Sequence, residues 1–84
     1  MDQNMQASFS MLVMSIASSA VMDMGLAPNP QNGEVNTDRG MARFNIDLLL
    51  MLQQKTQGNL QKEEAEFLEN IISDLQLKFV QSQT

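Results

Sequence analysis

Four glutamates in the last third of the chain are the residues whose type could support metal chemistry: Glu63, Glu64, Glu66 and Glu69. Carboxylate-bridged metal centres in helical bundles combine inward-facing glutamates with Glu-x-x-His motifs, and this sequence has no histidine. It has no cysteine either, which excludes disulfides, thiolate zinc sites and cysteine or histidine nucleophile pairs. We therefore expect the glutamates to form a solvated helix face. The sequence predicts a protein without metal or other cofactor that is not an enzyme.

A second pattern with chemical potential is the string Lys-Thr-Gln-Gly-Asn at residues 55–59. Glycine-rich turns at helix starts can bind phosphate on backbone N–H groups. Phosphate-binding loops follow a strand, however, and no strand pattern precedes this string. We interpret Gly58 as a helix stop, Asn59 as the cap of the next helix, and Lys55 as a cation placed favourably near a helix C-terminus.

Two single aspartates complete the candidates. Asp47 comes one helical turn after Arg43, which predicts a surface ion pair worth under about 1 kcal/mol. A binding role for Asp47 stays open because its charge is set among apolar neighbours. Asp23 is expected at the end of a helix, where the helix dipole disfavours a carboxylate. We interpret it as an exposed aspartate, with an ion pair to another segment as the alternative.

The charge distribution argues against nucleic acid as a partner. Ten acidic and five basic residues give a net charge of −5, and such a chain repels a phosphate backbone unless its cations cluster. The first cation is Arg39, so the preceding apolar stretch lacks the positive flank of a secretory signal. That stretch is also too short and too rich in serine to span a membrane. We expect a cytoplasmic protein that is not an integral membrane protein.

The elements that would position these groups are three helices in a single domain covering residues 1–84. The helices are expected at residues 7–25, 38–57 and 60–80, with a loop at 26–37. Gly25 should end the first helix, and Thr37 should cap the second. The link at Gly58 is so short that the second and third helices must form an antiparallel hairpin. The predicted fold is all-α, with a long first helix and a hairpin, completed as a helical bundle by oligomerisation.

The helical faces predict the packing. In the first helix one arc is assigned to the intramolecular core: Phe9, Leu12, Val13, Ile16, Ala17, Ala20, Val21 and Met24. The second helix has one stripe with Met41, Phe44, Leu48, Met51, Leu52 and Lys55, and another with Ala42, Ile46 and Leu49. The third has a single arc of Phe67, Leu68, Ile71, Ile72, Leu75 and Phe79, with Leu77 and Val80 outside it and an Asp74–Lys78 pair. The first two helices are thus more apolar than one packing face requires.

Several strings resemble one short bacterial family. These are Phe9-Ser10, Asn29-Pro30 with Gly33, Ile46-Asp47-Leu48-Leu49 with Met51-Leu52, Lys55-Thr56-Gln57-Gly58-Asn59-Leu60, and Leu75 with Phe79-Val80. Together they resemble the family named domain of unknown function 1844, and the Lys-Thr-x-Gly-Asn-Leu string is the most specific part. The resemblance implies a small, soluble, helical bacterial protein. It supplies no catalytic or binding residue.

The back of the first helix is the candidate interaction site. Its residues are Met11, Met14, Ser15, Ser18, Ser19 and Met22. Flexible thioethers adapt to exchangeable contacts, and small residues at Ser15 and Ser19 let another backbone approach closely. We hypothesise a homo-oligomer, a dimer or higher, in which this helix lies at the interface and is free to exchange between protomers. The alternative for this face is a monomer whose loop folds over it.

The function predicted from these observations is a non-enzymatic, self-associating helical interaction or scaffold module. Two alternatives stay open. The protein could be an adaptor or subunit that lends its first helix to a different protein, or it could bind a small ligand or a membrane surface through the methionine-lined face.

Overall fold

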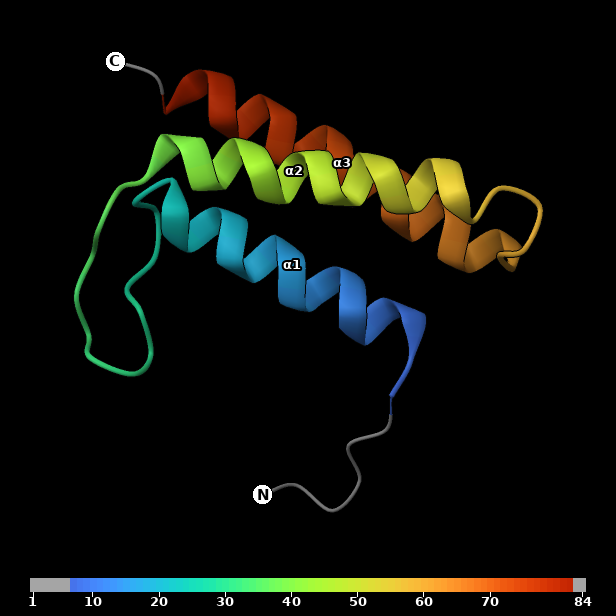
Figure 1. The fold of residues 1–84 in the computed structure, drawn as a ribbon, viewed down its shortest axis with the longest axis horizontal. Coiled ribbons are helices and arrows are strands. Elements are labelled where there is room, and N and C mark those ends of the chain that lie inside the picture. Colours follow the sequence, from blue (N-terminus) through green and yellow to red (C-terminus); the bar gives the residue numbers. More distant parts are fainter. Residues whose placement is uncertain (1–6, 83–84) are drawn as a thin grey trace.

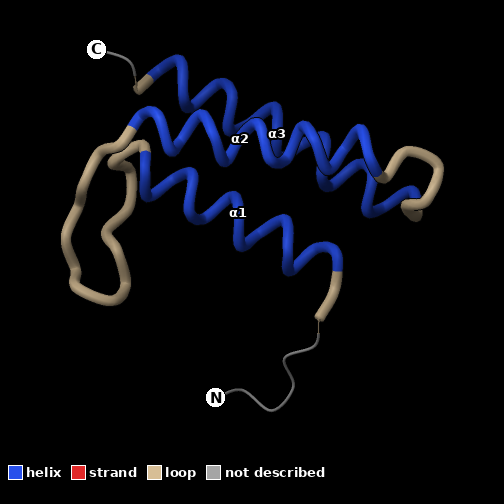
Figure 2. Tube along the Cα trace, in the orientation of Figure 1, coloured by secondary structure: helices blue, strands red, loops and turns tan. Residues whose placement is uncertain are grey.

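A computed structural model describes residues 7–82 of the chain, and within them it contains three helices and no strand. The helices are α1 (Phe9–Asp23), α2 (Arg39–Lys55) and α3 (Lys62–Gln81). Each observed end lies within two residues of the end expected from the sequence. The predicted all-α fold of three mutually packed helices is confirmed (Figures 1 and 2). The first helix is four residues shorter than its expected 19, because α1 has 15 residues.

The arrangement is flat. Both α1 and α3 run antiparallel to α2, and α3 lies behind α2 in the view of Figure 1. The Cα extents of 37 × 33 × 15 Å leave room for only about two layers of helices along the shortest axis, given helix spacings of roughly 10 Å. As a result α3 covers one side of the layer formed by α1 and α2, and no helix within residues 7–82 lies over the opposite side.

The ends of α1 follow from capping. The Ser8 hydroxyl oxygen accepts from the backbone N–H of Met11 at 3.1 Å, which sets the start. At the other end Gly25 adopts φ +79° and donates to the Met22 carbonyl, while Leu26 donates to the Val21 carbonyl. This pair of bonds is the Schellman motif, which satisfies carbonyls that the ending helix leaves free. The expected stop at Gly25 is confirmed.

The loop between α1 and α2 returns to its starting point rather than extending away. The backbone N–H of Asp38 donates to the Asp23 carbonyl at 2.7 Å, and Thr37 forms a bridge with Met24. Thr37 is therefore not the N-cap of α2, contrary to expectation. The cap is Asp38, whose carboxylate accepts from the Met41 N–H at 3.1 Å. Bridge pairing occupies the backbone of Thr37 and moves the helix start one residue along the chain.

The link between α2 and α3 differs from expectation in the same way. Gly58 has φ +85° just after the end of α2, so its interpretation as a helix stop is confirmed. Asn59 does not cap α3. The N-cap is Gln61, whose backbone N–H donates to the Glu64 carboxylate at 3.0 Å. A glutamate at the third helical position can accept a hydrogen bond from the N-cap backbone, and Glu64 stands in that position when Gln61 is the cap. The helix therefore starts two residues later than expected, and the turn after Gly58 includes both Asn59 and Leu60.

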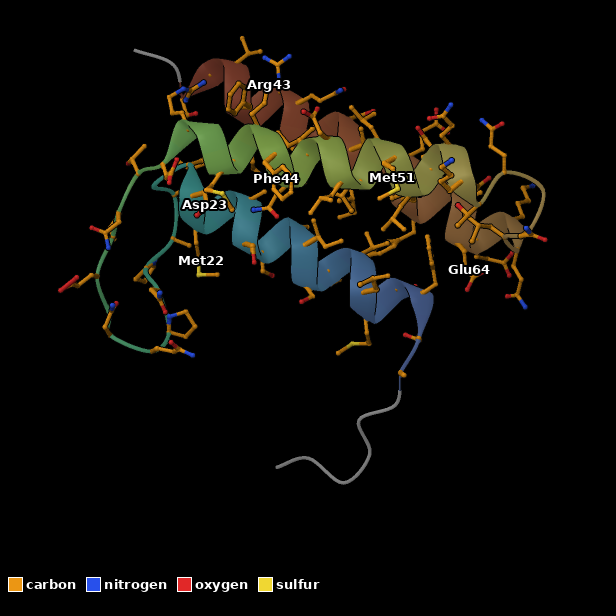
Figure 3. All side chains as sticks on the ribbon, viewed as in Figure 1. Met22, Asp23, Arg43, Phe44, Met51 and Glu64 are labelled. Carbon is orange, nitrogen blue, oxygen red and sulfur yellow. The ribbon has the colours of Figure 1, made fainter. Side chains whose placement is uncertain are left out.

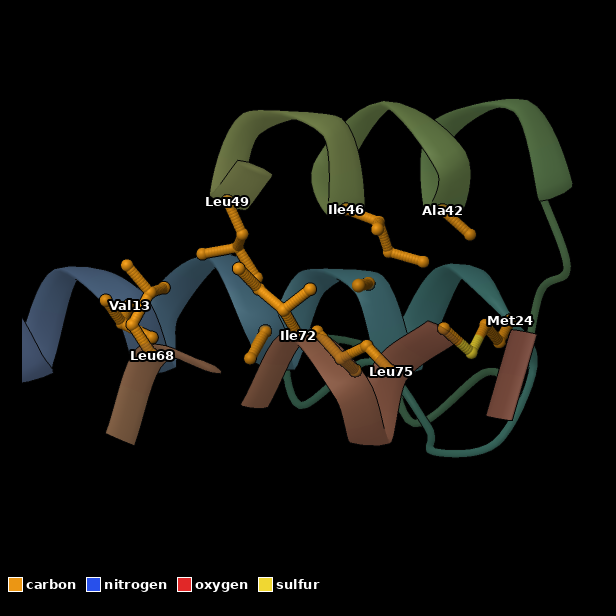
Figure 4. Packing of buried hydrophobic residues seen from close by; sticks show 10 residues of the cluster. Val13, Met24, Ala42, Ile46, Leu49, Leu68, Ile72 and Leu75 are labelled. Atoms are coloured by element: carbon orange, nitrogen blue, oxygen red, sulfur yellow. The ribbon is translucent and has the colours of Figure 1, made fainter. Parts of the chain in front are cut away.

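The core lies between the three helices (Figure 4). Its buried apolar residues are Val13, Ala17, Ala20, Met24, Ala42, Ile46, Leu49, Leu68, Ile72 and Leu75. Small residues at Ala17, Ala20 and Ala42 let α1 and α2 pack closely. The predicted arc of α3 is confirmed as the side that packs, and Leu77 and Val80 are exposed as expected. One member of the predicted α1 arc is wrong, because Leu12 is 47% exposed.

Candidate interaction surface

The side of α1 and α2 that faces away from α3 carries a row of large apolar side chains. On α2 these are Met41, Phe44, Leu48 and Met51, a set that we call the outer stripe. Met41, Phe44 and Met51 are 44%, 52% and 42% exposed, and Leu48 is half-buried. Figure 3 shows Phe44 and Met51 on the side of α2 turned toward the viewer. Helical spacing places Leu12 of α1 on the same side, so the outer stripe continues onto α1.

The second apolar row of α2, and not the outer stripe, faces the core. The residues that enter the core are Ala42, Ile46 and Leu49, with Asn45 beside them. A sequence with two apolar rows on one helix does not reveal which row faces inward, and the larger residues of the stripe proved to lie outside. The two charged residues between Met41 and Met51 in the chain, Arg43 and Asp47, line a surface hollow next to α3 and are not part of the stripe.

A second apolar surface is a groove where α1, the loop and α3 meet. Its volume is about 420 Å³ and its lining is almost entirely apolar. Met14, Ser18 and Met22 form its α1 wall, and Pro28 and Pro30 form the loop wall. Ile71, Asp74 and Leu75 line it from α3. We call this surface the α1 groove.

The six residues predicted as an interface are divided by the structure. Met14, Ser18 and Met22 line the α1 groove, so the loop does fold along part of this face. Met11 and Ser15 are exposed on the back of α1, and Ser19 is half-buried. The loop therefore lies along part of the predicted interface, and the other part is exposed or half-buried on α1.

The aspartate at the end of α1 is a structural group rather than an exposed one. The Nδ2 atom of Asn45 donates to the Asp23 carboxylate at 2.9 Å, and Asn45 is only 7% exposed. The expectation of an exposed Asp23 is wrong, and its partner is an amide rather than a cation. Asn45 is not among the residues singled out from the sequence. The signal was available, since a single amide on an otherwise apolar row needs a hydrogen-bonding partner.

The contacts of Arg39 with α3 are likewise not among the expectations from the sequence. Its guanidinium donates to the Phe79 carbonyl at 2.9 Å and to the Ser82 hydroxyl at 2.8 Å. It also lies over the Phe79 ring, 4.0 Å from the centroid. The cation therefore satisfies a carbonyl at the C-terminal end of α3. A cation at the start of α2 interacts unfavourably with the dipole of that helix. This unfavourable position could have indicated that Arg39 has a partner on another helix.

The remaining polar candidates form no chemical site. Glu63, Glu66 and Glu69 are exposed, and residues 7–82 contain no group of three acidic side chains that could hold a metal ion. Asp47 is exposed and does not pair with Arg43 in the described part of the chain, so the predicted ion pair is wrong. The predicted Asp74–Lys78 pair is confirmed at 2.6 Å.

These observations define a class: a small all-α protein of three antiparallel helices whose notable features are apolar surfaces rather than a polar site. None of the three described helices has the length and apolar character needed to cross a membrane. Residues 6–81 match the family described as Domain of unknown function (DUF1844). Because the match spans most of its length, the chain belongs to this family, as the resemblance indicated. Neither the curated proteins nor the solved structures include a significant match.

Proposed function

We propose that this chain is a non-enzymatic interaction module that associates with further copies of itself through the apolar surface of α1 and α2. The observation that supports this most is the outer stripe of α2. Large contiguous apolar patches are uncommon on monomeric proteins and mark interaction sites where they occur. A helix of the same chain already covers the other side of the layer, so a second copy is the simplest source of cover.

The composition of the exposed surface supports association over chemistry. Met11, Met14, Met41 and Met51 are all more than 40% exposed. Unbranched thioether side chains adapt to varied contacts and are frequent at protein interaction surfaces. The chain lacks histidine and cysteine, the side chains most used for proton transfer and nucleophilic attack near neutral pH.

Equilibrium sedimentation of the purified protein over a range of concentrations tests the proposal. We expect an average mass that rises with concentration to a multiple of the 9.4 kDa chain. A mass that stays at the monomer value up to a chain concentration of about 0.1 mM would overturn self-association, because the Kd of the dimer would then lie above about 0.1 mM.

A double substitution on α1 separates two versions of the proposal. Ser15→Glu with Ser18→Glu puts two charges on the back of α1, away from the outer stripe. If α1 is the assembly element, the mass of this variant falls to that of the monomer while its helix content is retained. If the oligomer persists, the outer stripe is the remaining candidate.

A second candidate function has one observation in its favour, the α1 groove. Its volume of about 420 Å³ lies in the range of ligand pockets, roughly 300 to 1,000 Å³. The protein would then act as an adaptor that binds apolar side chains of a different protein's helix. Ser18→Trp fills the groove and should abolish such binding, and where copies associate through the outer stripe the oligomer mass should stay unchanged. Flotation with phosphatidylglycerol vesicles distinguishes a lipid surface, which would recover the wild type with the vesicles.

A further inference from the structure

The spacing of the outer stripe is that of a helix-pairing seam. Met41, Phe44, Leu48 and Met51 follow one another at intervals of three, four and three residues. This alternation is the a/d pattern of a coiled coil, which keeps a narrow row of side chains facing a second helix. The inner row of α2 already packs on α1 and α3. A further helix is therefore needed to complete the seam.

The stripe is symmetric about one residue. Met41 and Met51 are each five positions from Ile46, and Phe44 and Leu48 are each two positions from it. We propose that α2 pairs with α2 of a second copy in antiparallel orientation, about a two-fold axis at the level of Ile46. Met41 then contacts Met51 of the second copy, and Phe44 contacts Leu48 of the second copy. This inference rests on the self-association proposed above and specifies its geometry.

Charge at the ends of the seam selects the antiparallel orientation. Lys55 lies nine residues after Ile46, and Thr37 lies nine residues before it, next to Asp38. The two-fold axis therefore brings Lys55 to the N-terminal end of the second copy's α2, where Asp38 lies. Lys55 is exposed, and within residues 7–82 it makes no ion pair. Parallel pairing would instead put two Lys55 side chains together and align the helix dipoles unfavourably.

The flat fold is compatible with this contact. None of the three described helices lies over the outer stripe, because α3 packs on the other side of the layer. An antiparallel two-fold arrangement also stacks α1 over α1 of the second copy, so that the exposed Leu12 extends the buried surface. The contact is isologous and closes at a dimer.

Complementary charges test which residues meet. Phe44→Glu and Leu48→Lys should each form a monomer of 9.4 kDa with unchanged helix content, because both positions lie outside the core. Mixed in equal amounts, the two variants should form a heterodimer, because the substitutions Phe44→Glu of one chain and Leu48→Lys of the other place opposite charges in contact. Parallel pairing gives no such contact, so the absence of a heterodimer would overturn the antiparallel register.

Disulfide trapping gives a second measurement, made simple because the chain has no cysteine. The variants Met41→Cys and Met51→Cys should cross-link with each other when mixed and oxidised, since the paired Cα atoms approach within the roughly 7 Å that a disulfide allows. Each variant alone should stay uncross-linked, because identical positions are about 15 Å apart along the axis. Leu77→Cys, exposed on α3, is the matched control and should cross-link with neither.

The outcomes separate this inference from the proposed function. A wild type that is monomeric overturns both. A wild-type oligomer that persists in Phe44→Glu overturns the pairing through α2 and leaves self-association intact. Cross-linking of Met41→Cys with itself also overturns the antiparallel orientation.

Discussion

The two sides of α2 carry apolar rows of similar length, but the fold treats them differently. The inner row is covered by α1 and α3 and includes the fully buried Ala42 and Leu49. The outer stripe holds larger side chains, of which Phe44 is 52% exposed. Apolar character alone therefore does not determine which side of α2 faces the core. A small residue such as Ala42 lets a neighbouring helix approach closely, and this is the row that entered the core.

The most direct way to break the comparison is to truncate one leucine on each side. Leu49→Ala should cost about 2 to 5 kcal/mol by leaving a cavity at a fully buried position, whereas Leu48→Ala, half-buried, should cost under about 1.5 kcal/mol. Urea unfolding followed by circular dichroism at one low protein concentration measures both. Glu66→Ala, on an exposed side of α3, is the control and should change stability by less than about 0.5 kcal/mol. Equal costs at positions 48 and 49 would show that the sides are misassigned.

The inner row depends on α1 being held against it, and Gly25 is part of that attachment. Its φ is +79°, and a Cβ atom at this position would collide with the Thr37 hydroxyl. Gly25→Ala should therefore cost about 2 to 3 kcal/mol from strain and collision. Gly58→Ala has a similar φ and open space around the added methyl group, so about 1 kcal/mol is expected there. Thermal unfolding of both variants checks the difference, and a larger loss at Gly58 would contradict this account.

The polar contact at the edge of the inner row gives a sharper test. Asp23→Ala removes the acceptor of the buried Asn45 amide and should cost about 1 to 3 kcal/mol. Asp23→Asn keeps an acceptor oxygen and should lose clearly less. If the two variants are equally stable by urea unfolding, the hydrogen bond to Asn45 does not contribute to stability.

The smallest expected effect concerns the end of α3 that rests on α2. Arg39→Met removes two hydrogen bonds and the contact with the Phe79 ring, for a loss of about 1 kcal/mol because the site is partly exposed. Amide hydrogen exchange should accelerate in the last turn of α3 and remain unchanged in its first turn. Arg43→Met, at an exposed position of the same helix, should leave the exchange pattern unaltered.

The amino-acid sequence is sufficient to predict which segments are helical and, to within two residues, where they end. Apolar spacing identified all three helices, Gly25 and Gly58 marked two of the ends, and the single apolar arc of α3 was assigned to the packed side correctly. These features are local, because a helix and its caps depend on residues within a few positions of one another. The family membership was also apparent from short strings of residues.

The packing of the three helices determines which apolar row of α2 faces inward, and with it the position of the outer stripe. It also decided that Thr37 pairs with Met24 rather than capping α2, and that Asp23 meets Asn45 across 22 residues of chain. Each of these choices compares contacts between distant segments, whose energies depend on how closely two helices approach. Periodicity along one helix contains no information about the shape of the surface that will pack against it, which is why these contacts could not be assigned before the helices were placed together.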